Sequence, residues 1–136
     1  MNIAIIFAGG TGQRMKTAAC PKQFLKLYGK PIIIYTLEIF QRHPAIDHII
    51  VPCVAGWEDE LRQMCRDKLY KIVPGGKNTQ ESKLNALHGL ADLCHDDDIV
   101  LMHDAVRPMI TPQLITDNIE AVKKYGSAIT ADPFTE

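Results

Sequence analysis

The chain has 136 residues, with 15 Lys and Arg against 16 Asp and Glu, and 46% of its residues are hydrophobic. This length suits one domain, residues 1–136, that buries roughly two-thirds of the surface its unfolded chain would expose. Because the charges nearly cancel, no general field attracts a nucleic-acid backbone or an anionic membrane, so any anion site must be local.

The cysteines and the N-terminus indicate the cellular compartment. Cys20, Cys53, Cys65 and Cys94 are far apart and form no C-x-x-C pair, which argues against a zinc site or a disulfide framework. The first apolar run ends at Ala8 and has neither a basic lead-in nor a cleavage site, so we expect no signal peptide and no membrane span. We therefore predict a cytoplasmic protein with reduced thiols.

Strand-like and helix-like segments alternate along the chain. Runs rich in apolar and β-branched residues predict strands at 2–8, 47–54, 70–73, 98–103 and 127–131. Helical spacing follows Pro31 and recurs at 57–69, 80–94 and 111–125. In the third of these helices, the spacing aligns Leu84, Leu87, Leu90 and Leu93 on one stripe. This alternation predicts a doubly wound, mostly parallel α/β sheet with right-handed crossovers.

Ligands of such sheets bind beyond the carboxyl ends of the strands, which directs attention to three loops. The first loop, residues 8–23, reads AGGTGQRMKTAACPKQ and contains three glycines, Arg14 and Lys22. Glycines let the backbone turn tightly and present several N–H donors to one anion, and the two cations add formal charge. We predict a phosphate site here; the alternative is a glycine-rich connection with two solvated cations.

The spacing of this loop differs from that of two common phosphate loops. The dinucleotide fingerprint G-x-G-x-x-G opens directly into a helix, whereas this loop reads G-G-x-G-x-R and continues through Pro21. A Walker loop needs Gly-Lys followed by Ser or Thr, but Pro31 and Asn78 follow the Gly-Lys pairs here. The loop is therefore of another type.

The second loop, residues 75–82, reads GGKNTQES, and the third loop, residues 102–109, reads MHDAVRPM. The residues of the second loop leave two readings open, a polar cap for the following helix or recognition of a base. In the third loop, Asp104 can hold Mg²⁺ or accept from a substrate hydroxyl. The alternative is an exposed pair with Arg107. His103 is predicted to be a satisfied residue at a strand end rather than a catalytic group.

Three motifs, in this order, resemble one enzyme family: AGGTGQRM…PKQFLKLYGKPIIIYTLEIF, PGGKNTQES and HDAVRP. The family is that of cytidylyltransferases making CDP-activated sugar-alcohol phosphates, which includes 2-C-methyl-D-erythritol 4-phosphate and ribitol-5-phosphate cytidylyltransferases. The resemblance runs from Ile3 to about Pro133. Related uridylyl- and thymidylyltransferases usually read P-K-P-L where this chain has Pro21-Lys22-Gln23-Phe24, which favours the cytidylyl branch.

The resemblance implies a Rossmann-like three-layer α/β/α nucleotidyltransferase fold and transfer of CMP from CTP to an alditol phosphate. Arg14 and Lys22 are the implied catalytic residues, which stabilise charge developing on the phosphates. Asp104 is implied to lie near Mg²⁺, the implied cofactor, and near the sugar phosphate, with Arg107 facing the acceptor phosphate. The implied nucleotide-binding residues are Ala8, Gly9, Gly10, Thr11, Gly12, Arg14, Lys22, Gly75, Gly76, Ser82 and Ala105.

Some departures favour ribitol 5-phosphate over 2-C-methyl-D-erythritol 4-phosphate as the acceptor, and hence a role in cell-wall teichoic acid or capsule rather than isoprenoid synthesis. Thr79 stands where the methylerythritol branch usually has arginine. Val106 and the Gly9-Gly10 pair also favour the ribitol-phosphate branch. Family members continue well beyond Glu136, with a dimer arm and a further lysine. We therefore expect the nucleotide-binding portion of a homodimeric enzyme, truncated after its fifth strand, either as a fragment of a longer protein or as a naturally shortened relative. The alternative function is nucleotide binding without turnover.

Overall fold

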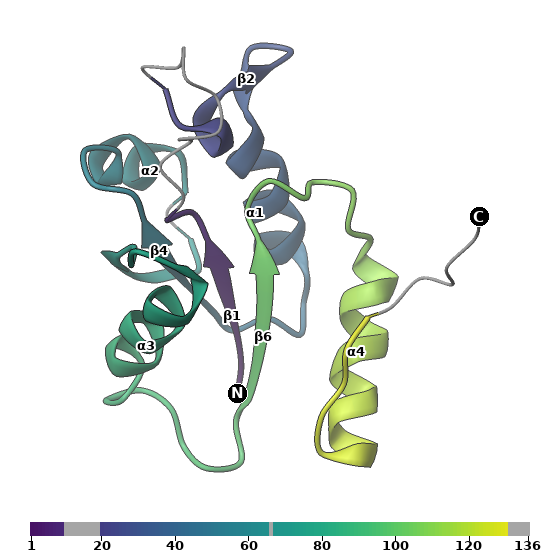
Figure 1. The fold of residues 1–136 in the computed structure, drawn as a ribbon. Helices are drawn as coiled ribbons and strands as arrows, with labels where there is room; N and C mark the ends of the chain where they lie inside the picture. The colour runs from purple at the N-terminus through teal and green to yellow at the C-terminus, as the bar shows by residue number, and fades with distance from the viewer. Residues whose placement is uncertain (10–19, 66, 131–136) are drawn as a thin grey trace, which may run out of the picture.

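The computed structural model describes residues 1–9, 20–65 and 67–130. Four parallel strands form the sheet of this part of the chain: β1 (Asn2–Phe7), β4 (His48–Cys53), β5 (Leu69–Pro74) and β6 (Ile99–Asp104). Their order is β5-β4-β1-β6, so the chain builds outward from β1 on one side and then crosses to the other (Figure 1). This reversal places the topological switch point between β1 and β6, which is where ligands of such sheets bind.

Helices cover both faces of the sheet. One core cluster joins alternate residues of β1 and β4, such as Ile6 and Val51, to α1 (Ile32–Arg42), α2 (Glu58–Met64) and α4 (Pro112–Tyr125). The other joins the intervening residues, such as Ile5 and Ile50, to α3 (Thr79–Gly89). This confirms the doubly wound, three-layer arrangement. Within the described ranges, no helix combines the length and apolar character needed to cross a bilayer.

Between β1 and α1 the chain forms a short 3₁₀ helix, η1 (Lys22–Phe24), and a hairpin of β2 (Lys26–Leu27) and β3 (Lys30–Pro31) that the sequence did not predict. Its two-residue turn has positive φ at both positions, 54° at Tyr28 and 79° at Gly29. Such turns match the twist of the flanking strands. The hairpin brings the chain back so that α1 begins at Ile32, directly after Pro31.

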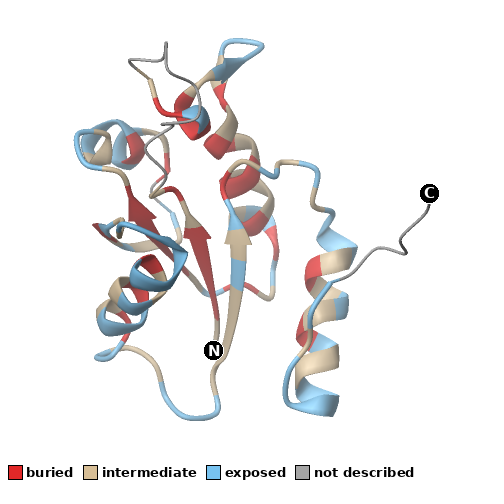
Figure 2. Cartoon of the chain, viewed as in Figure 1, coloured by how far each residue is buried: buried red, intermediate tan, exposed pale blue. Residues whose placement is uncertain are grey.

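The predicted fifth strand is wrong over the residues that the structure describes. Residues 127–130 have no strand conformation, and the Ile129 side chain is 92% exposed. A strand requires a partner for its backbone groups, and residues 127–130 pair with no strand of the described sheet. Instead, this segment contacts α4, where Asn118 Nδ2 donates to Thr130 Oγ1 at 2.9 Å. β6 is consequently an edge strand, with intermediate or exposed side chains along its whole length (Figure 2).

Two predicted helices are too long. The helix predicted at 57–69 ends at Met64, because Lys68 O accepts from Ile49 N and Leu69 already begins β5. The helix predicted at 80–94 begins at Thr79 and ends at Gly89. Of the predicted leucine stripe, Leu90 is buried at the C-cap and Leu93 packs against the same core cluster.

The buried face of α3 itself consists of small residues. Ser82 and Ala86 are buried, whereas Leu84 and Leu87 are exposed. A Cβ on Gly89 would lie 2.8 Å from Ile50 Cδ1, so the helix approaches the sheet more closely than a leucine stripe would permit.

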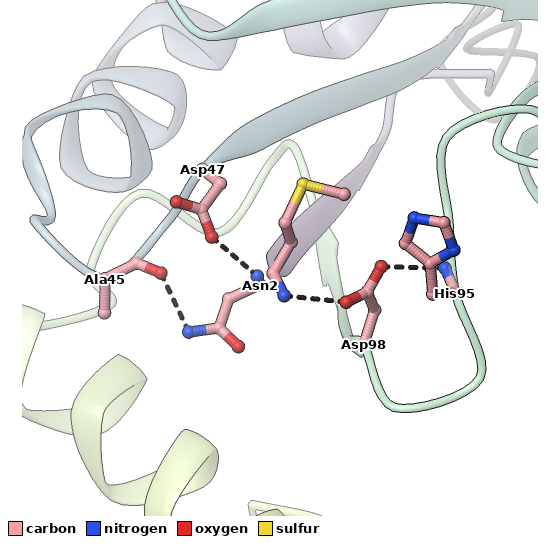
Figure 3. A network of polar contacts seen from close by, with 6 residues as sticks. Asn2, Ala45, Asp47, His95 and Asp98 are labelled. Atoms are coloured by element: carbon pink, nitrogen blue, oxygen red, sulfur yellow. Dashed lines mark hydrogen bonds and ion pairs between the residues drawn. The ribbon is translucent and has the colours of Figure 1, made fainter.

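At the amino ends of the strands, a polar network fixes the start of β1 (Figure 3). The Met1 ammonium donates to Asp98 Oδ1 at 2.7 Å, and the His95 amide donates to Asp98 Oδ2 at 2.8 Å. On the other side of the strand, Asn2 donates to Asp47 and to Ala45 O. These contacts tie β1 to the segments before β4 and β6, at the end of the sheet opposite to the three loops.

Candidate active site

The first and second loops meet at the carboxyl ends of β1 and β5. A Cβ on Gly75 would lie 2.6 Å from Gly9 Cα, and a Cβ on Gly9 would lie 3.0 Å from Gly75 Cα and 3.1 Å from Ser82 Oγ. Backbone therefore packs directly on backbone, and a side chain at Gly75 is excluded. The glycines at these two positions are explained by the contact between the loops, whatever they also contribute to a ligand.

Three amides of residues predicted to bind the nucleotide donate within the protein. Ala8 N donates to Pro52 O at 2.8 Å, Gly75 N donates to Cys53 O at 2.9 Å, and Gly76 N donates to Ser82 Oγ at 2.9 Å. Any contact of Ala8, Gly75 or Gly76 with a nucleotide must therefore use other atoms. The predicted amide donors of Gly10 and Gly12 lie outside the described residues.

Gln23 anchors the other end of the first loop to Ala8. Its side chain is 3% exposed, and Nε2 donates to Ala8 O at 2.7 Å, a carbonyl that also accepts from Val54 N. Lys22, the preceding residue, is exposed at the start of η1. The buried amide of Gln23 thus fixes the turn that carries the Lys22 cation beside the end of β1.

The third loop is a hydrogen-bonded turn at the end of β6. Val106 N donates to Asp104 Oδ1 at 3.2 Å, and Arg107 N donates to Asp104 O at 3.1 Å. His103 Nε2 lies 2.8 Å from Arg107 O and donates to it. The structure thus gives His103 a partner in its own loop, as the sequence predicted, while the side chains of Asp104 and Arg107 are both exposed.

The third loop lies beside the first because β6 pairs with β1. Phe7 is opposite Asp104 in the register, and Ala105 N donates to Phe7 O at 3.0 Å. Ala105 itself is fully buried, and its carbonyl accepts from Thr36 Oγ1 of α1 at 2.8 Å. The three loops therefore meet around the carboxyl ends of the strands, with the first and third flanking the switch point.

In the second loop, the capping role is visible. Asn78 Oδ1 accepts from Glu81 N at 2.8 Å as the N-cap of α3, and Ser82 Oγ, from a side chain that is 5% exposed, accepts from Gly76 N. Asn85 Nδ2 donates to Pro74 O at 2.8 Å and holds the loop at its start. Recognition of a base by this loop stays a prediction.

Gly10, Thr11, Gly12 and Arg14 lie outside the described residues, so their predicted roles rest on the sequence alone. Conversely, sequence reasoning missed Gln23 and Thr36 as residues that hold the loops. Their signal in the sequence was too general to single them out, since each is one polar residue beside apolar ones, and the helical pattern after Pro31 covers Thr36 but not Gln23.

The sequence matches the family described as IspD: 2-C-methyl-D-erythritol 4-phosphate cytidylyltransferase over residues 2–136. A ribitol-5-phosphate cytidylyltransferase of Vibrio parahaemolyticus is 49% identical over 140 residues, covering 100% of this chain and 59% of that protein. A 2-C-methyl-D-erythritol 4-phosphate cytidylyltransferase of Clostridium botulinum is 40% identical over 135 residues, covering 93% of this chain and 56% of that protein.

A solved structure agrees with these sequence matches. The 2-C-methyl-D-erythritol 4-phosphate cytidylyltransferase of Francisella tularensis has a TM-score of 0.71 and 34% identity, covering 90% of this chain and 52% of that one. The chain thus spans a little over half the length of the relatives it matches. These comparisons confirm the family resemblance and the Rossmann-like α/β fold. The chain belongs to the IspD family of cytidylyltransferases.

Proposed function

We propose that the protein to which this chain belongs transfers CMP from CTP to an alditol phosphate, ribitol 5-phosphate, and releases pyrophosphate. One observation carries the proposal. Gly9, at the carboxyl end of β1, packs on Gly75 of the second loop, and β1 borders the switch point of the sheet, in a chain 49% identical to a ribitol-5-phosphate cytidylyltransferase.

The proposed reaction places few demands on acid–base chemistry. A phosphate monoester has a second pKa near ~6, so the acceptor is largely dianionic at neutral pH and needs no general base. One of its oxygens attacks the α-phosphorus of CTP, and the bond between that phosphorus and the bridging oxygen breaks, which releases pyrophosphate. The protein must hold two polyanions in line and stabilise the charge that develops on the leaving group.

The cations of the first loop suit this task. Lys22 is exposed beside the end of β1, where Gln23 holds its turn against Ala8. In the proposal, Lys22 and Arg14 stabilise the phosphates of CTP, and Arg107 of the third loop binds the acceptor phosphate. A guanidinium can clamp two phosphate oxygens at once, which favours arginine for the acceptor.

Asp104 fits a magnesium ion through a single carboxylate. One of its oxygens accepts from Val106 N, and the side chain is exposed. Among the described residues, no group of three or more His, Cys, Asp or Glu gathers as a metal cage. Mg²⁺ usually keeps several waters and binds through one or two carboxylates plus phosphates, which agrees with one carboxylate here. When bound, it would neutralise charge on the triphosphate.

The acceptor is the finer part of the proposal. Thr79, an exposed residue at the first position of α3, stands where the methylerythritol branch usually carries arginine. A relative named 2-C-methyl-D-erythritol 4-phosphate cytidylyltransferase is nevertheless 40% identical, so that acceptor is the second candidate. We further propose that the protein is cytoplasmic, because its separated cysteines suit reduced thiols, and that it is a homodimer at family length, as the family resemblance implies.

The test measures binding and turnover separately. Calorimetry with CTP and MgCl₂ on the 136-residue chain should show binding. Pyrophosphate release should follow for a version extended to family length with the C-terminal segment of the Vibrio parahaemolyticus relative. Ribitol 5-phosphate should be the best acceptor in a panel that includes 2-C-methyl-D-erythritol 4-phosphate. If the extended version releases no pyrophosphate with any alditol phosphate, the proposal is wrong.

A pair of lysine variants locates the nucleotide. Lys22→Ala should weaken CTP binding about tenfold, the size expected for one charge-assisted hydrogen bond, without lowering the thermal midpoint. Lys26→Ala is the matched control, since Lys26 is also exposed but lies in the hairpin. Equal losses in both variants would indicate general charge attraction rather than a site at Lys22.

A further inference from the structure

Thr36 occupies an unusual position for a hydroxyl side chain. It lies within α1, is fully buried, and belongs to the helix face that packs on the sheet. Threonine in a helix often donates to a carbonyl of its own preceding turn. Here Oγ1 donates at 2.8 Å to Ala105 O, sixty-nine residues along the chain.

The Ala105 peptide is held from both sides. Its N–H donates to Phe7 O of β1 at 3.0 Å, and its carbonyl accepts from Thr36. Ala105 is fully buried, so water cannot replace the Thr36 hydroxyl without a shift of the backbone. The chain leaves the sheet at this residue and enters the turn that carries Arg107.

Bonds within the third loop set its shape but not its place. Asp104 accepts from the amides of Val106 and Arg107, and His103 donates to Arg107 O. All of these bonds would survive a movement of the turn as a unit. The bond from Thr36, like the bond from Ala105 N to Phe7 O, connects the turn to another element, which for Thr36 is α1.

That element also supports the first loop. α1 begins after the hairpin, and Ile32 N donates to Leu25 O at 2.9 Å, directly behind η1. η1 carries Lys22 and is fixed to β1 through Gln23. α1 therefore contacts both the segment that carries Lys22, the proposed nucleotide cation, and the turn that carries Arg107, the proposed acceptor group.

We propose that Thr36 is a positioning residue for the acceptor substrate. By holding the Ala105 carbonyl, it fixes Asp104 and Arg107 relative to the nucleotide loop. The catalytic part of this inference rests on the proposed cytidylyl transfer. In-line displacement is sensitive to small misplacements, and an error of about 1 Å can cost about 100-fold in rate. The hydroxyl contributes by geometry and touches neither substrate.

Three variants separate this role from general packing. Thr36→Val keeps the shape of the side chain and removes the hydroxyl, whereas Thr36→Ser keeps the hydroxyl and removes a buried methyl group. Thr116→Val is the matched control. It removes a hydroxyl of α4 that is hydrogen-bonded to His43 Nε2, at the C-cap of α1 and away from the third loop.

The first measurement needs no activity. Amide hydrogen exchange in the 136-residue chain should quicken about tenfold at Ala105 and Arg107 in Thr36→Val and stay near the wild-type rate in Thr36→Ser. Ile49 N, which donates to Lys68 O at the opposite end of the sheet, reports any general loss of stability. Unchanged relative exchange at Ala105 and Arg107 overturns the proposal, whether or not the protein proves to be a cytidylyltransferase.

The second measurement uses the version extended to family length. Thr36→Val should lower kcat by about 10- to 100-fold and raise the KM of the alditol phosphate, with the KM of CTP within about twofold of the wild type. Thr36→Ser should restore kcat although it lowers the thermal midpoint. Equal effects of Thr36→Val and Thr116→Val on kcat overturn the proposal. An inactive wild type would count against cytidylyl transfer, while the exchange experiment still decides the role of Thr36.

Discussion

Gly9 and Gly75 pack backbone against backbone, so that a Cβ on Gly75 would lie 2.6 Å from Gly9 Cα. The two residues follow β1 and β5, which are separated in the sheet by β4. Their contact therefore bridges the carboxyl end of the intervening strand and closes one side of the candidate site.

Gly75→Ala should destabilise the chain by about 1–3 kcal/mol, because the methyl group meets backbone that cannot rotate away. Gly9→Ala should cost less, since its closest contacts would be 3.0 and 3.1 Å and one of them is the Ser82 hydroxyl. Urea denaturation of the wild type, Gly9→Ala and Gly75→Ala measures their free energies of unfolding and hence this order. A Gly75→Ala variant as stable as the wild type would show that the two loops separate at no cost.

Gln23→Met should also destabilise the chain by about 1–3 kcal/mol and weaken CTP binding. The substitution keeps the length of the side chain but removes the buried hydrogen bond to Ala8 O. Gln63→Met, on the exposed face of α2, is the control and should change neither quantity. If Gln23→Met alters stability but leaves CTP binding intact, the turn carrying Lys22 does not depend on this bond.

The ion pair of Met1 and Asp98 should give Asp98→Asn a pH-dependent effect on stability. The hydrogen bond to Asp98 raises the pKa of the N-terminal amine above 8.0, and the same bond, with the His95 amide, lowers the pKa of Asp98 below 3.8. The amine contributes fully below pH 8.0 and loses its contribution as pH rises through its raised pKa. The carboxylate contributes fully above pH 3.8 and loses its contribution as pH falls through its lowered pKa.

The difference in thermal midpoint between wild type and Asp98→Asn should therefore be largest between pH 3.8 and 8.0 and shrink on both sides. Asp96→Asn is the control, because Asp96 is an exposed neighbour in the same turn. A difference that stays constant from acid to alkaline pH would mean that the ion pair does not titrate with folding.

The cysteines should differ in reactivity. Burial raises the pKa of Cys53 to about 12 and that of Cys65 to about 11, and both thiols are buried. Since only the thiolate reacts, iodoacetamide at about pH 8 should label these two only after unfolding in urea. Cys20 and Cys94 are half-buried and should label first in the folded chain. Mass spectrometry of the labelled peptides measures the labelling rate of each cysteine. Equal labelling rates at all four cysteines would contradict the burial of Cys53 and Cys65.

The sequence by itself determined the four strands of the main sheet and the four α-helices in their chain order, and the positions of the three loops. Apolar runs that alternate with helical patterns identify β1, β4, β5 and β6. The motifs around Lys22 and Asp104 can be recognised because their glycines, prolines and charged residues stand at fixed spacings. The family followed from those motifs. The same local signals failed at residues 127–130, where β-rich composition is present but no strand pairs with it.

Tertiary structure decided which residues hold the site together. No local pattern distinguishes Gln23 or Thr36 from other polar residues, and their roles depend on hydrogen bonds to Ala8 and Ala105, far along the chain. In the same way, α3 packs by Ser82 and Ala86 while Leu84 and Leu87 are exposed, because close approach to the sheet favours small side chains. Periodicity specifies which faces of an element are apolar, but only the packed fold determines which groups meet across it.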